Sequence, residues 1–168
     1  MTWARAWAVS TGVAILLIPL VVIAVRVQIS MGWIFAFVFI YGAPIWLGCF
    51  AAQLWIALEL FTPDSAFHLG PRSSRRLVYG LLWVYLATLT FFCLFMSDGG
   101  DADDWQSPAG HFLGVDGYNG NTPEFLWRAE AVAMPSLLVS WGSLFGAAVV
   151  YGVTVLRYRR SRTGSAAR

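Results

Sequence analysis

Four apolar stretches, each close to the length that crosses a membrane, take up most of this 168-residue chain. A helix rises about 1.5 Å per residue, so about 20 apolar residues cross a hydrocarbon core of about 30 Å. The stretches cover residues 7–25, 33–58, 77–96 and 131–156. They predict an all-α membrane protein: a bundle of four transmembrane helices that forms a single domain over residues 1–160.

The composition is typical of a membrane protein and argues against one class of function. The chain is 58% hydrophobic and 12% charged, against about 25% charged residues in a typical soluble domain. No Asp, Glu, Lys, Arg or His lies inside the four stretches. Ionisable residues within the bilayer mark ion pathways and proton relays. Their absence argues against a self-contained transporter that is coupled to protons or ions.

The arginines predict how the chain is oriented. If the four spans alternate in direction, Arg26 and Arg128 fall on one side and the other nine of the eleven arginines fall on the opposite side. Because cytoplasmic loops carry the excess of basic residues, we expect both termini in the cytoplasm and residues 97–130 outside. The chain has no lysine, which is typical of a GC-rich genome. We therefore expect the plasma membrane of a GC-rich bacterium.

The outer loop is acidic and begins with four aspartates in seven residues. Asp98, Asp101, Asp103 and Asp104 supply the hard oxygen ligands that Ca²⁺ prefers, but their spacing is not that of an EF-hand. A solvated acidic turn is the expectation, and cation binding stays open. Both histidines lie outside the stretches, whereas a membrane haem would need histidines within them. No cofactor, catalytic residue or metal site is predicted.

Small residues in the fourth stretch indicate where helices pack. Gly142 and Gly146 form a GxxxG pair, and Ser136 and Ser140 precede it. Small residues at this spacing let two helices approach closely in lipid. The partner helix belongs either to this chain, to a second copy or to another membrane protein. In the second stretch, Pro44 follows Gly42 and predicts a kink, because proline cannot donate a backbone hydrogen bond.

The inner side carries a candidate site around the loop between the second and third spans. An acid and a histidine beside arginines are suited to a phosphate or an anionic headgroup. The alternative is that the glutamine forms an interhelical hydrogen bond and that the charged residues are solvated groups that set the topology. The candidate residues are Gln53, Glu59, Asp64, His68, Arg72, Arg75 and Arg76.

Three functions remain open. The first is a non-enzymatic accessory or scaffold subunit that acts through helix–helix contacts. The alternative is a transporter or channel component for an apolar or amphipathic molecule, and the third is an enzyme that works at the membrane interface through the inner-face residues. The expected partners are the lipid bilayer, anionic headgroups at the cytoplasmic face, and a membrane-protein partner or a second copy.

The basic segment 157–162 continues directly from the last span. This position suits lipid headgroups, so nucleic acid is not an expected partner. Residues 161–168 lack apolar content and are expected to form a disordered tail. The two cysteines, Cys49 and Cys93, fall at different depths in their spans, and a disulfide needs Cα atoms within about 7 Å. Free thiols are therefore expected.

Overall fold

A computed structural model describes residues 3–30, 32–99, 105–115 and 121–166. Within these residues the chain is helical, and four helices are long and apolar enough to cross a membrane. This confirms the helical fold and the four apolar segments. The elements are α1 (Trp3–Ile29), α2 (Trp33–Tyr41), α3 (Ala43–Phe61), α4 (Ala66–Leu69), α5 (Arg72–Phe95), α6 (Pro108–Phe112) and α7 (Glu124–Ala166).

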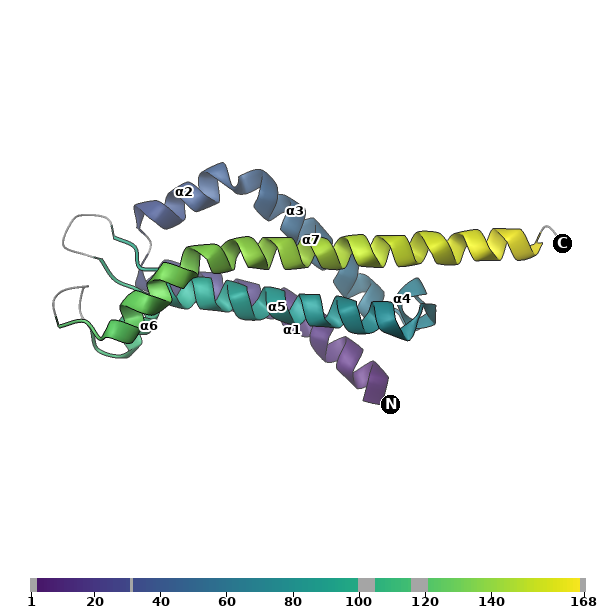
Figure 1. Ribbon diagram of the computed structural model, residues 1–168, viewed down its shortest axis with the longest axis horizontal. Coiled ribbons are helices and arrows are strands. Elements are labelled where there is room, and N and C mark those ends of the chain that lie inside the picture. Colours follow the sequence, from purple (N-terminus) through teal and green to yellow (C-terminus); the bar gives the residue numbers. More distant parts are fainter. Residues whose placement is uncertain (1–2, 31, 100–104, 116–120, 167–168) are drawn as a thin grey trace.

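The long helices run alternately up and down, so the bundle has two distinct ends (Figure 1). The N-terminus, α4, the start of α5 and the last turns of α7 gather at one end, which we call the arginine-rich end. The segments around α6 and the starts of α2 and α7 lie at the opposite end, which we call the loop end. Arg26 lies in the last turn of α1, at the loop end.

The second expected span is two helices rather than one. Gly42 is both the last cap of α2 and the first cap of α3, and Pro44 lies in the first turn of α3. The break therefore lies where a kink was expected, because Pro44 has no N–H for the preceding turn. The carbonyl oxygen of Val38 accepts two hydrogen bonds at this break, from the backbone nitrogen of Gly42 at 3.0 Å and from the indole Nε1 of Trp46 at 3.2 Å. α2 consequently leans away from the other helices (Figure 1).

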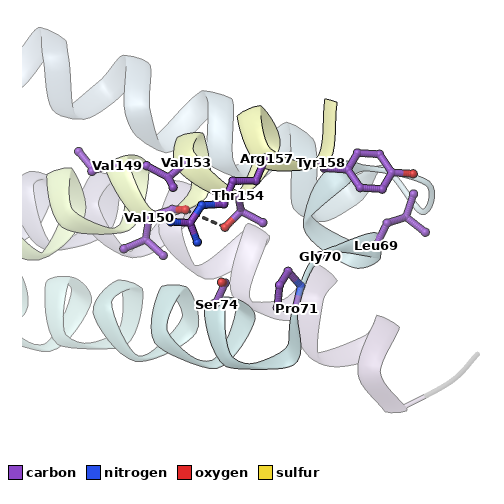
Figure 2. Close-up of a pocket in the computed structure, with 10 residues that line it drawn as sticks. All are labelled: Leu69, Gly70, Pro71, Ser74, Val149, Val150, Val153, Thr154, Arg157 and Tyr158. Atoms are coloured by element: carbon purple, nitrogen blue, oxygen red, sulfur yellow. Dashed lines mark hydrogen bonds between the residues drawn. The ribbon is translucent and has the colours of Figure 1, made fainter. Parts of the chain in front are cut away.

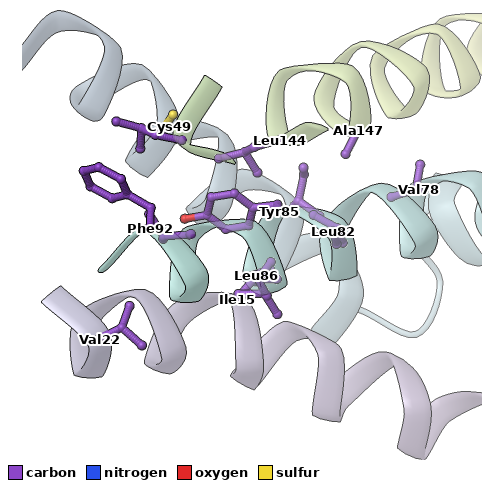
Figure 3. Packing of buried hydrophobic residues seen from close by; sticks show 14 of the residues in the cluster. Ile15, Val22, Cys49, Val78, Leu82, Tyr85, Leu86, Phe92, Leu144 and Ala147 are labelled. Atoms are coloured by element: carbon purple, nitrogen blue, oxygen red, sulfur yellow. The ribbon is translucent and has the colours of Figure 1, made fainter. Parts of the chain in front are cut away.

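The core is built around α5, which packs most extensively against α7 and also against α1. Figure 3 shows side chains from several helices meeting there, with Ile15 of α1, Tyr85 and Leu86 of α5, and Leu144 of α7 among them. In lipid there is no hydrophobic drive between helices, so dispersion and interhelical hydrogen bonds hold such a core together.

α7 contacts α5 through a row of small and apolar residues spaced three or four apart. Ser136 and Ser140 lie in this row, and their hydroxyls donate to the backbone oxygens of Thr88 and Tyr85, both at 3.2 Å. These bonds let the two helices run close together. The fully or almost fully buried members of the row are Ala133, Leu137, Ser140, Leu144, Ala147 and Tyr151.

The two glycines of the GxxxG pair lie in different surroundings. A Cβ placed on Gly142 would meet no atom within 4 Å, whereas one placed on Gly146 would lie 3.6 Å from Cδ1 of Leu81 on α5. Gly142 is exposed on the outer surface of the bundle. Within this chain, therefore, α7 contacts α5 through the row that contains Ser136 and Ser140, and Gly142 is turned away from that contact.

The remaining expectations concern single residues and the tail. Cys49 and Cys93 are both buried free thiols, as expected. α7 begins at Glu124 and continues as helix to Ala166, so residues 161–166 are helical where a disordered tail was expected. Residues 167–168 lie outside the described part of the chain.

Candidate functional site

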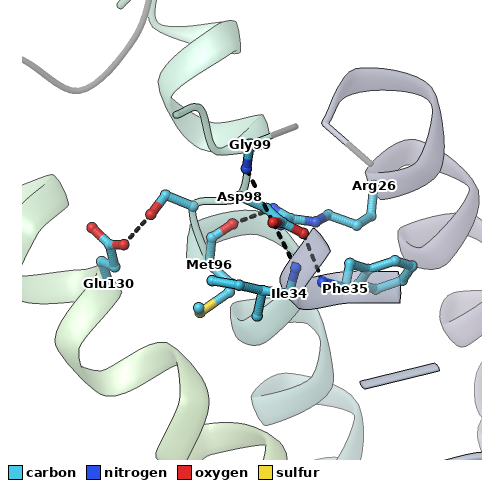
Figure 4. Close-up of polar contacts among 8 residues, drawn as sticks. Arg26, Ile34, Phe35, Met96, Asp98, Gly99 and Glu130 are labelled. Atoms are coloured by element: carbon cyan, nitrogen blue, oxygen red, sulfur yellow. Dashed lines mark hydrogen bonds and ion pairs between the residues drawn. The ribbon is translucent and has the colours of Figure 1, made fainter. Parts of the chain in front are cut away.

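The loop end holds a buried ion pair between α1 and the segment after α5. Arg26 is 1% exposed, and its Nη2 lies 3.4 Å from Oδ2 of Asp98. Nη1 donates a hydrogen bond to the backbone oxygen of Met96. The Phe35 ring of α2 lies 5.6 Å from the guanidinium carbon, within cation–π range. Figure 4 shows these groups converging from three parts of the chain.

Besides pairing with Arg26, Asp98 caps the N-terminus of α2. Its carboxylate accepts hydrogen bonds from the backbone nitrogens of Ile34 at 3.0 Å and Phe35 at 2.7 Å. A carboxylate at a helix N-terminus satisfies free N–H groups and complements the helix dipole. The chain approaches closely here. A Cβ on Gly32 would lie 2.5 Å from the nitrogen of Gly99 and nearer still to the Asp98 carboxylate.

This ion pair connects α1 and α2 to the segment that follows α5. A buried charge is costly unless it is paired and hydrogen-bonded, and both partners here have several polar contacts. Arg26 follows the first apolar stretch in the sequence, and this pair was not predicted. A signal was available, because Arg26 continues the row Ile15, Pro19 and Val22, which is buried in α1.

The pair also bears on the acidic loop. Asp98 is engaged with Arg26 and α2, so this carboxylate is not solvated. Asp101, Asp103 and Asp104 lie outside the described residues. On α7, Oε1 of Glu130 accepts a hydrogen bond from the Ser97 hydroxyl, which links the start of α7 to the same region (Figure 4). No group of three metal-type ligands occurs among the residues that the structure describes.

The arginine-rich end holds a cavity of about 280 Å³, which we call the basic pocket. It lies between the first turns of α1, the short helix α4 and the first two turns of α5. Four of its lining residues are basic and two are aromatic, and none is acidic. The lining residues are Ala4, Trp7, His68, Arg72, Arg75, Arg76 and Tyr79.

α4 is held in place by a buried aromatic ring. Phe67 is 2% exposed and its ring lies at right angles to that of Tyr79, with 5.3 Å between the centroids. It also lies 6.0 Å from the ring of Tyr151 on α7. The neighbouring His68 has its Nε2 3.3 Å from the backbone oxygen of Leu60. Phe67 thus anchors the loop and positions His68 at the basic pocket.

A second cavity, of about 440 Å³, lies on the other side of α4 against α7. We call it the valine groove, because Val149, Val150 and Val153 line it. In Figure 2 these valines belong to α7, Leu69 and Pro71 to the segment around α4, and Arg157 lies beyond them along α7. An apolar wall that ends in a basic residue suits an amphipathic molecule better than a polar one.

The structure brings together part of the candidate inner-face site. His68, Arg72, Arg75 and Arg76 line the basic pocket, whereas Gln53, Glu59 and Asp64 do not. Asp64 is exposed in the turn before α4 and does not share a helix with His68. Nε2 of Gln53 donates to the hydroxyl of Tyr85, which joins α3 to α5.

Sequence reasoning missed the two aromatic residues of the pocket. Tyr79 lies four residues after Arg75 and seven after Arg72, on the same helix face, so its spacing was a usable signal. Trp7 comes from a distant part of the chain, and no sequence pattern connected it with the arginines. Comparisons find no protein-family model, no curated protein and no solved structure with a significant match to this chain.

Proposed function

We propose that this protein is a non-enzymatic accessory or scaffold subunit of a membrane complex, with both termini in the cytoplasm and acting through helix–helix contacts. Each of the four spanning helices contains an apolar segment of 18 residues, and only 33–39% of that segment is buried within the chain. The remaining helix surface contacts either lipid or another protein. The proposed membrane is the plasma membrane, in line with the arginine distribution.

The observation that carries this proposal is the open surface around Gly142. A glycine on a lipid-facing helix surface leaves a recess where another helix can approach closely. Beside it on α7 lie Leu138, Phe145 and Val149, which are 40–65% exposed. We propose that a transmembrane helix of a partner protein packs on this surface. A second copy of the chain is the other expected partner.

The test is affinity purification of the full chain from native membranes in mild detergent. We expect a stoichiometric membrane-protein partner, and Gly142→Leu should reduce its recovery because the recess is filled. Gly80→Leu is the matched control, because Gly80 on α5 is also exposed and has no atom within 4 Å of an added Cβ. Recovery of a lone monomer from wild type, or equal loss in both variants, would contradict the proposal.

The second candidate function is handling of an apolar or amphipathic molecule. It is favoured by the valine groove, which has an apolar wall on α7 and Arg157 beside it. The volume falls in the range of about 300–1,000 Å³ that is usual for small-molecule sites. A monomer that co-purifies with lipid, and loses that lipid when Val153→Trp fills the groove, would select this function over the first.

A further inference from the structure

We propose that the basic pocket is a binding site for an anionic phosphate group. The proposal is independent of the accessory role, because it concerns the arginine-rich end and not the outer surface of α7. Phosphate of this kind comes either from a lipid headgroup or from a free phosphate ion. The pocket's chemistry is the same for both, and the experiment below separates them.

The basic pocket carries a concentrated positive charge. Arg72, Arg75 and Arg76 lie on one face of α5, at spacings of three and four residues, and His68 faces the same cavity from α4. Among the described residues, ion pairs between arginine and a carboxylate occur at Arg26 and Arg128, and neither of these lines the pocket. Guanidinium groups present several N–H donors in a fixed plane, which matches phosphate oxygens.

The aromatic residues of the pocket indicate its level in the membrane. Trp7 and Tyr79 line it, and Trp7 lies 6.1 Å from Trp83, centroid to centroid. Tryptophan and tyrosine prefer the headgroup level of a bilayer. From Tyr79 to Arg72 is about 10 Å along the helix, so the arginines extend from this level toward water. A lipid phosphate at the arginines would have its acyl chains beside the apolar parts of α1 and α5.

The pocket is assembled from separate helices. α1 supplies Trp7, α4 supplies His68, and α5 supplies the arginines and Tyr79. The buried Phe67 fixes α4 against the bundle, so His68 is held at the cavity rather than left on a free loop. α5 begins at Arg72, and the positive end of its dipole adds to the attraction for an anion.

The test measures binding to the full chain, purified in a neutral detergent and stripped of lipid. Phosphatidylglycerol and phosphatidylcholine with the same acyl chains are compared by native mass spectrometry. We expect phosphatidylglycerol to bind the wild-type protein at least about tenfold more tightly, since each basic residue near a headgroup adds to the attraction. In R72Q/R75Q/R76Q this preference should disappear.

Two further variants keep the test decisive. R157Q/R159Q/R160Q removes the same charge from the end of α7 and should keep the preference. R72K/R75K/R76K keeps the charges that support insertion but loses the planar donors, so it should bind with intermediate affinity. Melting temperature in detergent shows that each variant is folded. Inorganic phosphate, added alone and as a competitor, identifies the source of the ligand.

If inorganic phosphate at millimolar concentration neither binds nor displaces phosphatidylglycerol, the ligand is a lipid headgroup. If it binds, displaces the lipid and loses both effects in R72Q/R75Q/R76Q, the pocket takes free phosphate. Retention of the phosphatidylglycerol preference in a folded R72Q/R75Q/R76Q would overturn the proposal. The proposal would also be overturned if R157Q/R159Q/R160Q lost the phosphatidylglycerol preference, either to the same extent or alone. Loss in that variant alone would place the lipid at the valine groove, and equal loss would indicate binding to the basic surface in general.

Discussion

At the scale of single residues, the most consequential side chain is Arg26. It lies at the end of α1, fully buried, and connects through Asp98 to the first turn of α2. Breaking a buried pair leaves a charge without its partner, which costs more than the pair itself contributes. Removing one partner should therefore destabilise the protein strongly.

Arg26→Gln should destabilise the protein by about 3 kcal/mol, the lower end of the range for a broken buried pair, because Asp98 keeps its backbone donors. Arg128→Gln is the control. Arg128 pairs with Glu124 at 2.6 Å, but both side chains are more than 75% exposed, so the loss should stay below about 1 kcal/mol. Unfolding in detergent, followed by circular dichroism, measures both. Equal losses would show that the Arg26 pair is as solvated as the exposed one.

Gly32→Ala should also lower the melting temperature. The added methyl group has no room beside Asp98 and Gly99, so the cap of α2 must shift. Gly80→Ala adds the same atom to an open helix surface and should raise stability by up to about 1 kcal/mol, since alanine favours helix over glycine. If Gly32→Ala is neutral, the close approach at the loop end is not a constraint on the fold.

At the scale of helices, the number and rough positions of the spans were predictable, but their packing faces were not. In a soluble helix the apolar stripe marks the buried face. Here the lipid-facing side is apolar as well, so Val149 is 65% exposed whereas Leu144 is fully buried. Ser136 and Ser140 of α7 were predicted as packing candidates from residue size, as was Gly142, but the direction in which Gly142 faces depends on how the helices pack and could not be predicted.

The candidate site was predictable to a similar extent. His68 and the three arginines are close in sequence, so a short loop had to bring them near one another. Arg26 and Asp98 belong to different loops of the expected topology, and no sequence pattern joined them. Asp64 lies four residues before His68, a spacing that would place both on one face of a continuous helix, but α4 begins only at Ala66.

Two substitutions on α7 test the assignment of its faces. Ala147→Leu inserts a large side chain into the fully buried contact with α5 and should cost about 1–3 kcal/mol through overpacking. Gly142→Leu adds its side chain where no atom lies within 4 Å, and leucine favours helix over glycine, so the isolated chain should be at least as stable as wild type. Melting in detergent compares them. Greater destabilisation by Gly142→Leu would reverse the assigned faces.

At the scale of the whole molecule, the two ends of the bundle differ in the number of arginines that they carry. The starts of α1 and α5 and the last turns of α7 lie at one end, whereas the end of α1 and the start of α7 lie at the other (Figure 1). Arg5, the three pocket arginines and Arg157 belong to the first group, and Arg26 and Arg128 belong to the second. The basic residues predict that the arginine-rich end is cytoplasmic. The proposed phosphate site and the proposed partner surface then have defined positions relative to the membrane.

Cysteine accessibility in intact cells tests this orientation most directly. In a background without Cys49 and Cys93, Leu113→Cys places a thiol on the loop end, where the native side chain is 58% exposed. Ser73→Cys places one at the exposed start of α5. A membrane-impermeant maleimide should label Leu113→Cys in intact cells, and Ser73→Cys only after the membrane is opened. The reverse pattern would contradict the orientation and with it the cytoplasmic position of the basic pocket.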